Sequence, residues 1–323
     1  MNEMVDRELI LSSADYRAVV SSLGASLRRY FQKRDREETD IVWGYSGAQN
    51  KKGGQGDVLI PFPGRVAYGR YRFDGQELQL PCNDKEGPNA IHGFVRSAVW
   101  GVRESSESHV SFESGIDARE YATRGYPFSL HMTLTYRLER NGLSCTFVVR
   151  NVGERDAPVG VGFHPYFTVG TQTVNEAEVK VPAADYLELA DTLAPTGRLL
   201  RVDTIGFRAD QYRRIGETRF NHCFLNVVRD TTGLCTIPFR NPNTGRTVSL
   251  EMDTSFTSFV LYTGDAIQNA PRRALAIEPM TCASDAYNHP QWGLKRLSPE
   301  EAFSGMYRIS ISGSDHVTDP LSA

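Results

Sequence analysis

The chain has 323 residues, of which 40% are hydrophobic and 23% are charged, a composition typical of globular proteins rather than of disordered chains or coiled coils. Its 36 Lys and Arg residues against 39 Asp and Glu residues leave a formal charge of −3, so we expect neither a nucleic-acid-binding surface nor a polybasic membrane anchor. The length permits two domains, but all-β chains of this size often form one large unit.

The cysteines and the N-terminal segment indicate a protein of the cell interior. The five cysteines are far apart, odd in number and without a Cys-x-x-Cys pair, so we expect neither a zinc site nor a complete disulfide framework. Glu3, Asp6, Arg7 and Glu8 interrupt the first apolar stretch, which is not typical of a signal peptide. Because no apolar run of about 18 residues occurs, we expect a soluble, cytoplasmic protein that does not interact with membranes.

Strands are predicted along the whole chain. Residues 71–73 and 77–80 flank an Asp74-Gly75 turn, and residues 129–138 and 143–150 flank an Asn141-Gly142 turn. Both segments of the second pair alternate apolar and polar side chains, and the two turn residues favour positive φ, which indicates a hairpin with one buried face. Further strands are predicted at 8–12, 16–20, 108–112, 223–228, 248–252, 258–262 and 306–311.

Helical periodicity is nearly absent, and only short helical turns near Glu86 or over residues 299–303 are expected. Twenty-eight Gly and 16 Pro residues punctuate the chain at short intervals. Many strands separated by turns predict an all-β fold of antiparallel sheets packed as a sandwich. With no repeat or linker in the sequence, we expect one domain spanning residues 1–323.

Several common catalytic motifs are missing, among them the GxxxxGK[ST] phosphate loop, HExxH and Gly-x-Ser-x-Gly. A glycine cluster at Gly53, Gly54 and Gly56 follows Lys51 and Lys52, but no strand precedes it and no helix follows it. We therefore interpret it as a mobile loop rather than as a phosphate cradle.

Polar residues beside backbone-constraining ones form three candidate sites. His164 precedes Pro165 among aromatic residues, and Glu278 precedes Pro279 at the end of an apolar strand. Residues 89–96 form the third, where His92 lies beside a glycine, and Gly64-Arg65 is a weaker fourth. Taken singly, each has an ordinary structural explanation, as a core histidine, a salt-bridged strand end or a solvated arginine.

Taken in chain order, these segments resemble the aldose 1-epimerases, also called galactose mutarotases. The resemblance rests on Gly-Arg-Val-x-x-Gly-x-Tyr-x-Phe-Asp-Gly at 64–75, on residues 89–94, on His-Pro-Tyr-Phe at 164–167, on Tyr-Thr-Gly-Asp at 262–265 and on Glu-Pro at 278–279. It covers nearly the whole chain, from residue 8 to residue 312. The resemblance implies a large antiparallel β-supersandwich, in agreement with the strand pattern.

The resemblance also implies an activity, the interconversion of the α and β anomers of a hexose. It implies that His164 is the general acid, that Glu278 is the general base, that Arg65 and His92 hold sugar oxygens, and that Tyr262 lines the cleft. Such a base takes the proton of the C1 hydroxyl while the acid protonates the ring oxygen, which opens the ring. Ordinary pKa values would leave the glutamate ionised and let the histidine carry a proton. Neither a metal nor an organic cofactor is implied, and the expected partner is a monosaccharide.

The sequence departs from the galactose mutarotases at three places. Asn221, in Asn-His-Cys-Phe at 221–224, replaces an Asp that binds sugar hydroxyls, and an amide can still accept and donate there without bringing charge. Gly64 replaces an Asn before the arginine, and His-Gly-Phe at 92–94 replaces His-Gly-Gly. These changes leave the reaction class in place and the preferred sugar open.

Two alternative functions also remain open. In a hexose-6-phosphate 1-epimerase, Arg70, Arg72 or Arg96 would bind the phosphate, because a guanidinium group suits phosphate geometry, although the same arginines would also suit a solvated strand. A non-catalytic carbohydrate-binding protein is the other alternative, because a fold does not dictate a function. The rate at which a freshly dissolved sugar equilibrates its anomers separates an enzyme from a binder.

Overall fold

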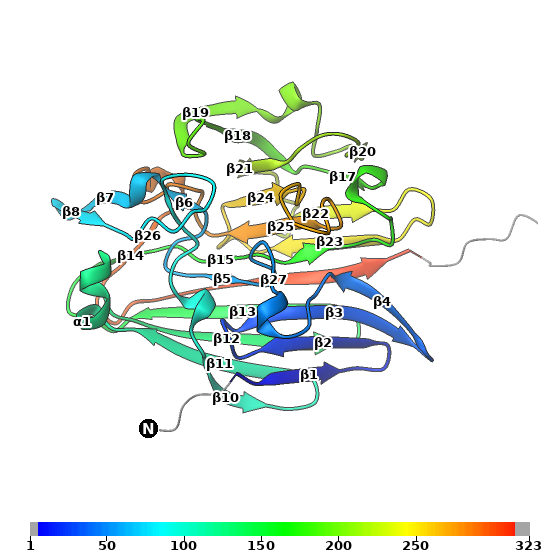
Figure 1. Ribbon diagram of the computed structural model, residues 1–323, viewed down its shortest axis with the longest axis horizontal. Coiled ribbons are helices and arrows are strands. Elements are labelled where there is room, and N and C mark those ends of the chain that lie inside the picture. The colour runs from blue at the N-terminus through cyan, green and yellow to red at the C-terminus, as the bar shows by residue number, and fades with distance from the viewer. Residues whose placement is uncertain (1–5, 314–323) are drawn as a thin grey trace, which may run out of the picture.

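The computed structural model describes residues 6–313, which form two large antiparallel sheets packed against each other (Figure 1). The first sheet has 12 strands. Along its main path these are β1 (Glu8–Ser12), β2 (Tyr16–Ser21), β3 (Ser26–Arg34), β4 (Glu37–Val42), β16 (Tyr166–Phe167), β25 (Leu275–Met280), β24 (Ser258–Tyr262), β21 (Asn221–Val227), β18 (Ala183–Leu189) and β19 (Pro195–Arg201). Two short strands, β15 (Gly162–Phe163) and β5 (Val58–Leu59), join it beside β25.

The second sheet has nine strands. In spatial order they are β10 (Gly101–Ser105), β11 (His109–Ile116), β12 (Leu130–Glu139), β13 (Gly142–Asn151), β27 (Ala302–Ser312), β23 (Thr247–Met252), β22 (Cys235–Arg240), β17 (Glu178–Val179) and β20 (Arg213–Arg214). Its long central strands β12, β13 and β27 pair over almost their whole lengths. This pairing explains why their alternating sequence pattern is the clearest in the chain.

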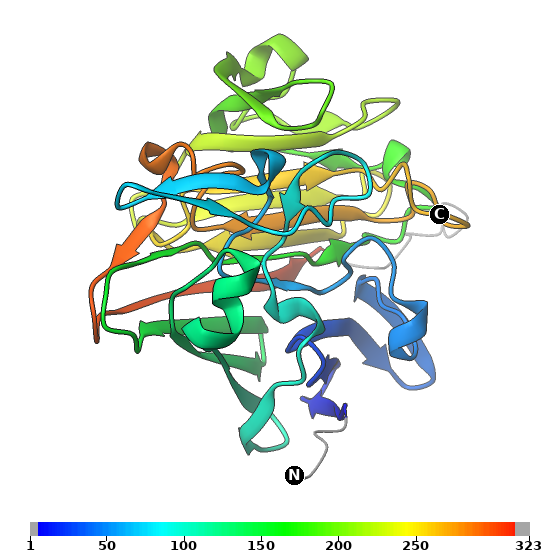
Figure 2. The same ribbon diagram turned by 60° about the vertical axis from the view of Figure 1, so that its left-hand side comes forward.

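Three small two-stranded sheets complete the described strands, namely β14 (Ala157–Val159) with β26 (Lys295–Leu297), β6 (Arg65–Val66) with β9 (Ala90–Ile91), and β7 (Arg70–Phe73) with β8 (Gln76–Gln79). Figure 2 shows the chain that carries β6, β7, β8 and β9, in blue to cyan, crossing in front of the yellow and orange strands of the first sheet. The segments that precede and follow these small sheets therefore come to lie over the centre of that larger sheet.

Helix is scarce in the described residues. One four-residue helix, α1 (Ala118–Tyr121), is capped by Asp117, whose side chain accepts from the Arg119 amide. Short 3₁₀ turns lie at Ala48–Asn50, Ala67–Gly69, Val95–Ser97, Ala122–Arg124, Val174–Glu176, Val202–Ile205 and Pro290–Trp292. The predicted helical turns are wrong at both places, because Glu86 lies in a bend and residues 299–303 form a turn that leads into β27.

The predicted all-β sandwich is confirmed, and every predicted strand falls on an observed one. The Asp74-Gly75 turn is as predicted, with φ of +48° and +77° between the paired residues Phe73 and Gln76. The other turn lies one residue earlier than predicted, because Gly142 already pairs with Glu139. A Cβ at Gly142 would lie 2.2 Å from the Ile309 carbonyl oxygen, so close packing against β27 explains this glycine.

Aromatic side chains join the two large sheets. Phe163 of β15 lies 4.8 Å from Tyr307 of β27 and 6.2 Å from Phe147 of β13, measured between ring centroids. The Tyr136 hydroxyl of β12 donates to the Ala25 carbonyl at the start of β3. All of these residues, Ala25 included, are buried in one hydrophobic core. The core therefore lies between the sheets and leaves the opposite face of the first sheet available for a site.

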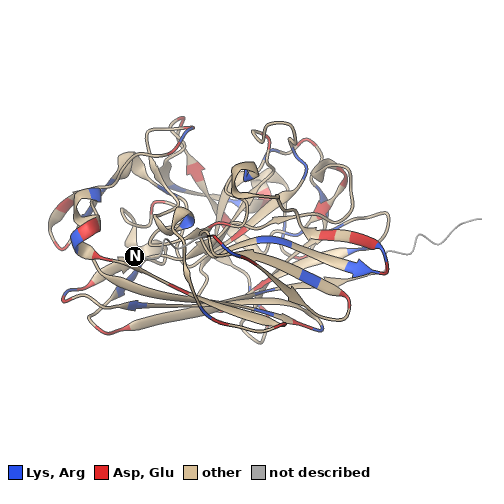
Figure 3. Cartoon of the chain, turned by 60° about the horizontal axis from the view of Figure 1, so that its bottom comes forward, with Lys and Arg blue, Asp and Glu red and all other residues tan. Residues whose placement is uncertain are grey.

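Lys and Arg residues are interspersed with Asp and Glu residues on both sheets and on the loops (Figure 3). No helix of the described residues is long and apolar enough to span a membrane. The predicted domain, 1–323, extends beyond the described residues at both ends, and Glu3 lies outside them. The single domain stays a prediction.

Candidate active site

The centre of the first sheet forms the floor of the site. Cross-strand pairing places Cys223 of β21, Val260 of β24 and Glu278 of β25 in one row. Asn221, Tyr262 and Ala276 form the neighbouring row. Because alternate residues of a strand point to opposite faces, both rows face away from the second sheet, whereas Ile277 and Leu275 point into the core between the sheets.

His164 reaches the same face through an interruption in the sheet. Strands β15 and β16 both pair with β25, and His164-Pro165 lies between them, opposite Glu278 and Ile277. Phe163 points into the core, so the next side chain, that of His164, points the other way. The His164 ring stacks on the Tyr166 ring at 5.0 Å, and the Tyr166 hydroxyl donates to the Gly53 carbonyl.

A cavity of about 540 Å³ opens above this floor. Its volume falls in the range of about 300–1,000 Å³ that small-molecule sites occupy. Residues from the loops before β5 and around β6 and β9 form its walls. All six residues that the sequence resemblance assigned to a site line this one cavity, namely Arg65, His92, His164, Asn221, Tyr262 and Glu278.

His164 and Glu278 are in direct contact. The Nε2 atom of His164 lies 3.3 Å from Oε1 of Glu278, and their side chains are only 6% and 4% exposed. The Nδ1 atom of His164 has no hydrogen-bond partner within residues 6–313. A buried acid and a buried base therefore meet on the cavity floor, where each is accessible to a molecule bound above it.

Burial sets the protonation of this pair. It raises the pKa of Glu278 to about 8 and lowers the pKa of His164 to about 3, because an interior of low polarity disfavours the charged form of each group. Arg65 acts in the opposite direction on the pKa of Glu278, with a smaller effect. Both shifts run toward the uncharged form of each group. The sequence-based assignment of an ionised Glu278 beside a protonated His164 stays a prediction.

His92 forms the wall next to His164. The two ring centroids lie 5.4 Å apart in a T-shaped arrangement, and burial is the main reason that the pKa of His92 lies well below its usual value. Its backbone has φ of +65°, and the neighbouring Gly93 approaches the Ile60 carbonyl so closely that a Cβ would lie 2.1 Å from the oxygen. The glycine thus permits the chain to bring a neutral imidazole to the cavity.

The same histidines and Glu278 have the donor atoms of a metal site. One ligand atom from each of His92, His164 and Glu278 lies within 4.8 Å of the others. The sequence-based expectation that no metal takes part stays a prediction.

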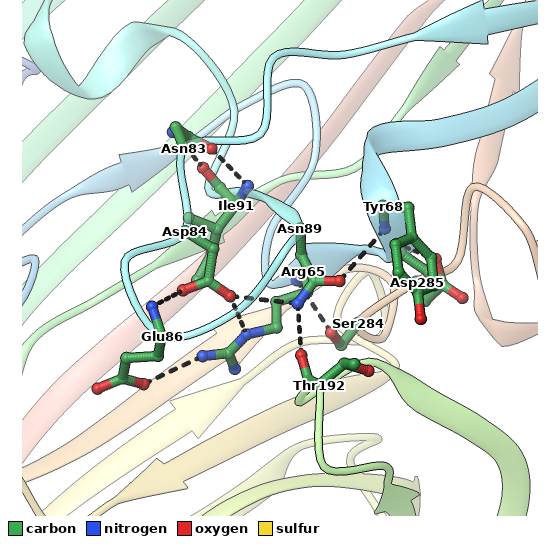
Figure 4. A network of polar contacts seen from close by, with 11 residues as sticks. Arg65, Tyr68, Asn83, Asp84, Glu86, Asn89, Ile91, Thr192, Ser284 and Asp285 are labelled. Carbon is green, nitrogen blue, oxygen red and sulfur yellow. Dashed lines mark hydrogen bonds and ion pairs between the residues drawn. The ribbon is translucent and has the colours of Figure 1, made fainter.

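Arg65 is held by a dense polar network (Figure 4). Its Nε donates to Asp84 at 2.7 Å and its Nη2 donates to Glu86 at 3.3 Å. Its backbone amide donates to the Ser284 hydroxyl at 2.9 Å. The Asp285 amide donates in turn to the Arg65 carbonyl, so the segment just after β25 anchors the arginine beside Glu278.

A second charged cluster was not predicted from the sequence. The buried Asp57 pairs with Lys51 and lies 3.7 Å from the Arg96 guanidinium. Burial raises the pKa of Asp57, an effect that the two cations oppose. The glycine-rich segment is the one sequence signal for this cluster. A Cβ at Gly54 would lie 3.1 Å from His164 Cδ2 and 3.4 Å from Asp57 Oδ2, so close packing against both residues explains that glycine.

Of His222 and the three arginines suggested for phosphate binding, only one residue lines the cavity. His222, on the opposite face of β21 from Asn221, packs against Tyr186 at 5.0 Å between ring centroids and does not line the cavity. Of the three arginines suggested for phosphate binding, only Arg96 lines the cavity, whereas Arg70 and Arg72 are exposed on the small β7–β8 sheet. The phosphate alternative therefore loses two of its three candidate ligands.

Comparisons with known proteins agree with this fold. The family model described as aldose 1-epimerase matches residues 8–310. An uncharacterized protein of Escherichia coli (strain K12), YihR, is 31% identical over 280 residues, which span 86% of this chain and 85% of that protein. Galactose mutarotase of Homo sapiens is 30% identical over 183 residues, but these span only 54% of this chain and 51% of that enzyme. The crystal structure of a GalM/aldose epimerase homologue from C. elegans has the same fold, with a TM-score of 0.84 at 19% identity, covering 96% of this chain and 100% of that chain.

Proposed function

Because this chain belongs to the aldose 1-epimerase family, we propose that it is a mutarotase, which interconverts the α and β anomers of a hexose. The observation that supports this most is the 3.3 Å contact between His164 and Glu278 on the floor of a cavity that fits a monosaccharide. Anomer exchange needs a base at the C1 hydroxyl and an acid at the ring oxygen, two atoms bound to the same carbon.

In the proposed reaction, the proton shared by the pair first moves from the Glu278 carboxyl to Nε2 of His164 across their contact. Glu278 then takes the proton of the C1 hydroxyl while His164 gives its proton to the ring oxygen. The bond between C1 and the ring oxygen breaks, and a carbonyl group forms at C1. Rotation about the C1–C2 bond presents the other carbonyl face, and closure reverses both proton transfers to give the other anomer.

The number of protons on the pair is the same before and after this cycle. One proton serves both groups, whether it resides on the carboxyl or on the imidazole. The raised pKa of Glu278 and the lowered pKa of His164 therefore do not oppose the mechanism. They mean that the site holds the correct total charge at neutral pH and needs only an internal proton shift.

The cavity walls supply donors for the oxygens whose charge changes. Arg65 brings a fixed guanidinium and His92 brings an imidazole that burial keeps neutral, so each can donate to a sugar oxygen. Fixed donors aimed at developing charge are a large source of rate enhancement in water-poor sites. Asn221 and Tyr262, neighbours across β21 and β24, provide further hydrogen-bonding groups for hydroxyls.

Polarimetry of freshly dissolved α-D-glucose and α-D-galactose tests the proposal. We expect the protein to accelerate the approach to the equilibrium rotation for at least one of these sugars. Glu278→Gln and His164→Asn should each reduce the acceleration by about 10²–10⁴-fold while the protein stays folded. His109→Asn is the matched control. His109 lies on β11 and does not line the cavity, so this variant should keep the wild-type rate.

The same assay evaluates the two alternatives. A non-catalytic sugar-binding protein would leave the rate at its spontaneous value for every sugar offered. A hexose-6-phosphate 1-epimerase would act on glucose 6-phosphate much faster than on glucose, and Arg96→Met would remove that preference. Equal rates on the free and the phosphorylated sugar would contradict the phosphate alternative.

A further inference from the structure

Two carboxylates bind the Arg65 guanidinium, and they differ sharply. The Asp84 side chain is 4% exposed and accepts from Nε at 2.7 Å. The Glu86 side chain is 47% exposed and accepts from Nη2 at the longer distance of 3.3 Å. An exposed ion pair is screened by solvent and contributes little, whereas a buried charged hydrogen bond restricts geometry strongly. The two acids are thus expected to act differently on the same arginine.

Asp84 is itself held in place from several sides (Figure 4). It accepts from the Glu86 amide at 3.1 Å and from the Asn89 side-chain amide at 3.3 Å. Asn89 is fully buried, donates to the Thr192 carbonyl at 2.7 Å and accepts from the Tyr68 amide. Partial burial acts to raise the pKa of Asp84, but the hydrogen bonds from Arg65 and from the Glu86 amide outweigh it and keep that pKa below its ordinary value.

The bond to Nε has a geometric consequence. A guanidinium group is planar and rigid, so fixing Nε restricts the directions of its other N–H bonds. Within the described residues Nη1 of Arg65 has no hydrogen-bond partner, and the side chain lines the cavity beside Glu278, whose pKa it lowers. A donor that is held in place and left unpaired is suited to an oxygen atom of a bound sugar.

We propose that Asp84 is a positioning residue, which fixes the Arg65 guanidinium so that its unpaired N–H groups meet an oxygen of the substrate. This inference rests on the proposed function of the cavity and assigns to Asp84 a role that acts only through Arg65. Glu86, bound to the same guanidinium but exposed, has no such role. The competing explanation is that Asp84 only stabilises the loop through its bonds to Glu86 and Asn89.

A double-mutant cycle separates the two explanations. Asp84→Asn keeps an oxygen for the Glu86 amide and removes the charged acceptor from Arg65, and we expect kcat/KM for the accepted sugar to fall tenfold or more. Arg65→Lys keeps a positive charge but lacks Nε, so adding Asp84→Asn to it should cost less than a further twofold. Glu86→Gln, which removes the exposed carboxylate from the same guanidinium, should cost clearly less than Asp84→Asn.

Three results would overturn the proposal. The first is an unchanged kcat/KM in Asp84→Asn. The second is an equal fold-loss of kcat/KM from Asp84→Asn in the wild type and in Arg65→Lys. The third is a loss of kcat/KM in Glu86→Gln as large as that in Asp84→Asn. Additive losses are the signature of a loop-stabilising role, because that role does not need the arginine.

A measurement on the wild-type protein serves if Asp84→Asn does not fold. In ¹H–¹⁵N spectra the Arg65 Nε–H signal, assigned by its loss in Arg65→Lys, should be sharp and slow to exchange with water, because Asp84 holds it. A signal broadened by rapid exchange would contradict the fixed geometry. The proposed function fails separately, since a wild-type protein that does not accelerate anomer exchange refutes the mutarotase assignment whatever the spectrum shows.

Discussion

Replacing Glu278 by Gln should stabilise the fold, and increasingly so as the pH rises. Burial raises the pKa of this carboxyl from an ordinary 4.5 to about 8. A group whose pKa is raised on folding contributes its full stability below the unfolded-state pKa and loses it as the pH rises through the folded-state pKa. The wild type therefore loses stability between about pH 4.5 and pH 8, and a neutral glutamine amide does not.

The size of the effect follows from the two pKa values. At about 1.36 kcal/mol per pH unit, the wild type should lose roughly 1 kcal/mol by pH 5, roughly 3 kcal/mol by pH 7 and roughly 5 kcal/mol by pH 9, all relative to low pH. The glutamine side chain has nearly the same shape, and across the 3.3 Å contact its amide can donate to Nε2 of His164 as a protonated carboxyl would. The free energy of unfolding of the variant should exceed that of the wild type by about these amounts.

Urea denaturation at pH 5, 7 and 9 measures this difference directly. We expect the stability advantage of Glu278→Gln to grow with pH while its mutarotase activity stays low. Glu113→Gln, which changes a half-exposed carboxylate on β11, is the control and should show little pH-dependent difference. An advantage that is constant with pH, or a variant less stable than the wild type at pH 9, would refute the reasoning that burial alone dominates the pKa of Glu278.

Three further predictions concern the site. The kcat/KM of the wild type should be nearly flat from about pH 5 to pH 7 and fall above about pH 8, where Glu278 loses the last proton of the pair. A pH–rate profile in which kcat/KM rises above about pH 8 would contradict this. Gly54 has φ of +76°, and a Cβ there would lie 3.1 Å from the His164 ring, so Gly54→Ala should lower kcat/KM about tenfold in polarimetry. Gly101→Ala, whose Cβ would lie 3.6 Å from the nearest atom, on Glu113, should leave kcat/KM unchanged. Asn221→Ala should raise KM about tenfold with a smaller change in kcat, and an unchanged KM would exclude its contact with the sugar.

The long strands could be predicted from the sequence because each buries one face. Buried and less buried residues alternate along all ten positions of β12 and along the last nine of β13, so the period of two is visible without any knowledge of partners. Strands such as β15, β16 and β6 have only two residues and no period, so the tertiary contacts alone define them. The predicted helical turn at Glu86 failed because side-chain bonds from Asp84 and Asn89 shape that loop instead.

The site could be predicted where a residue belongs to a recognisable segment, and not where it is a single acid in a loop. His164 and Glu278 each lie beside a proline in a distinctive segment, and the fold brings them to one cavity. Asp57 and Asp84 carry no such signal, because each gains its importance from contacts with an arginine outside its own short segment, Arg96 for Asp57 and Arg65 for Asp84. The direction in which burial moves the two pKa values could not be predicted from the sequence, since burial depends on the whole sheet.

A crystal structure of Glu278→Gln with the sugar that the wild-type protein converts tests the central claim most directly. We expect the C1 hydroxyl to lie within hydrogen-bond distance of residue 278 and the ring oxygen within hydrogen-bond distance of His164 Nε2. A sugar bound with its anomeric carbon turned away from both side chains, or bound outside this cavity, would contradict it.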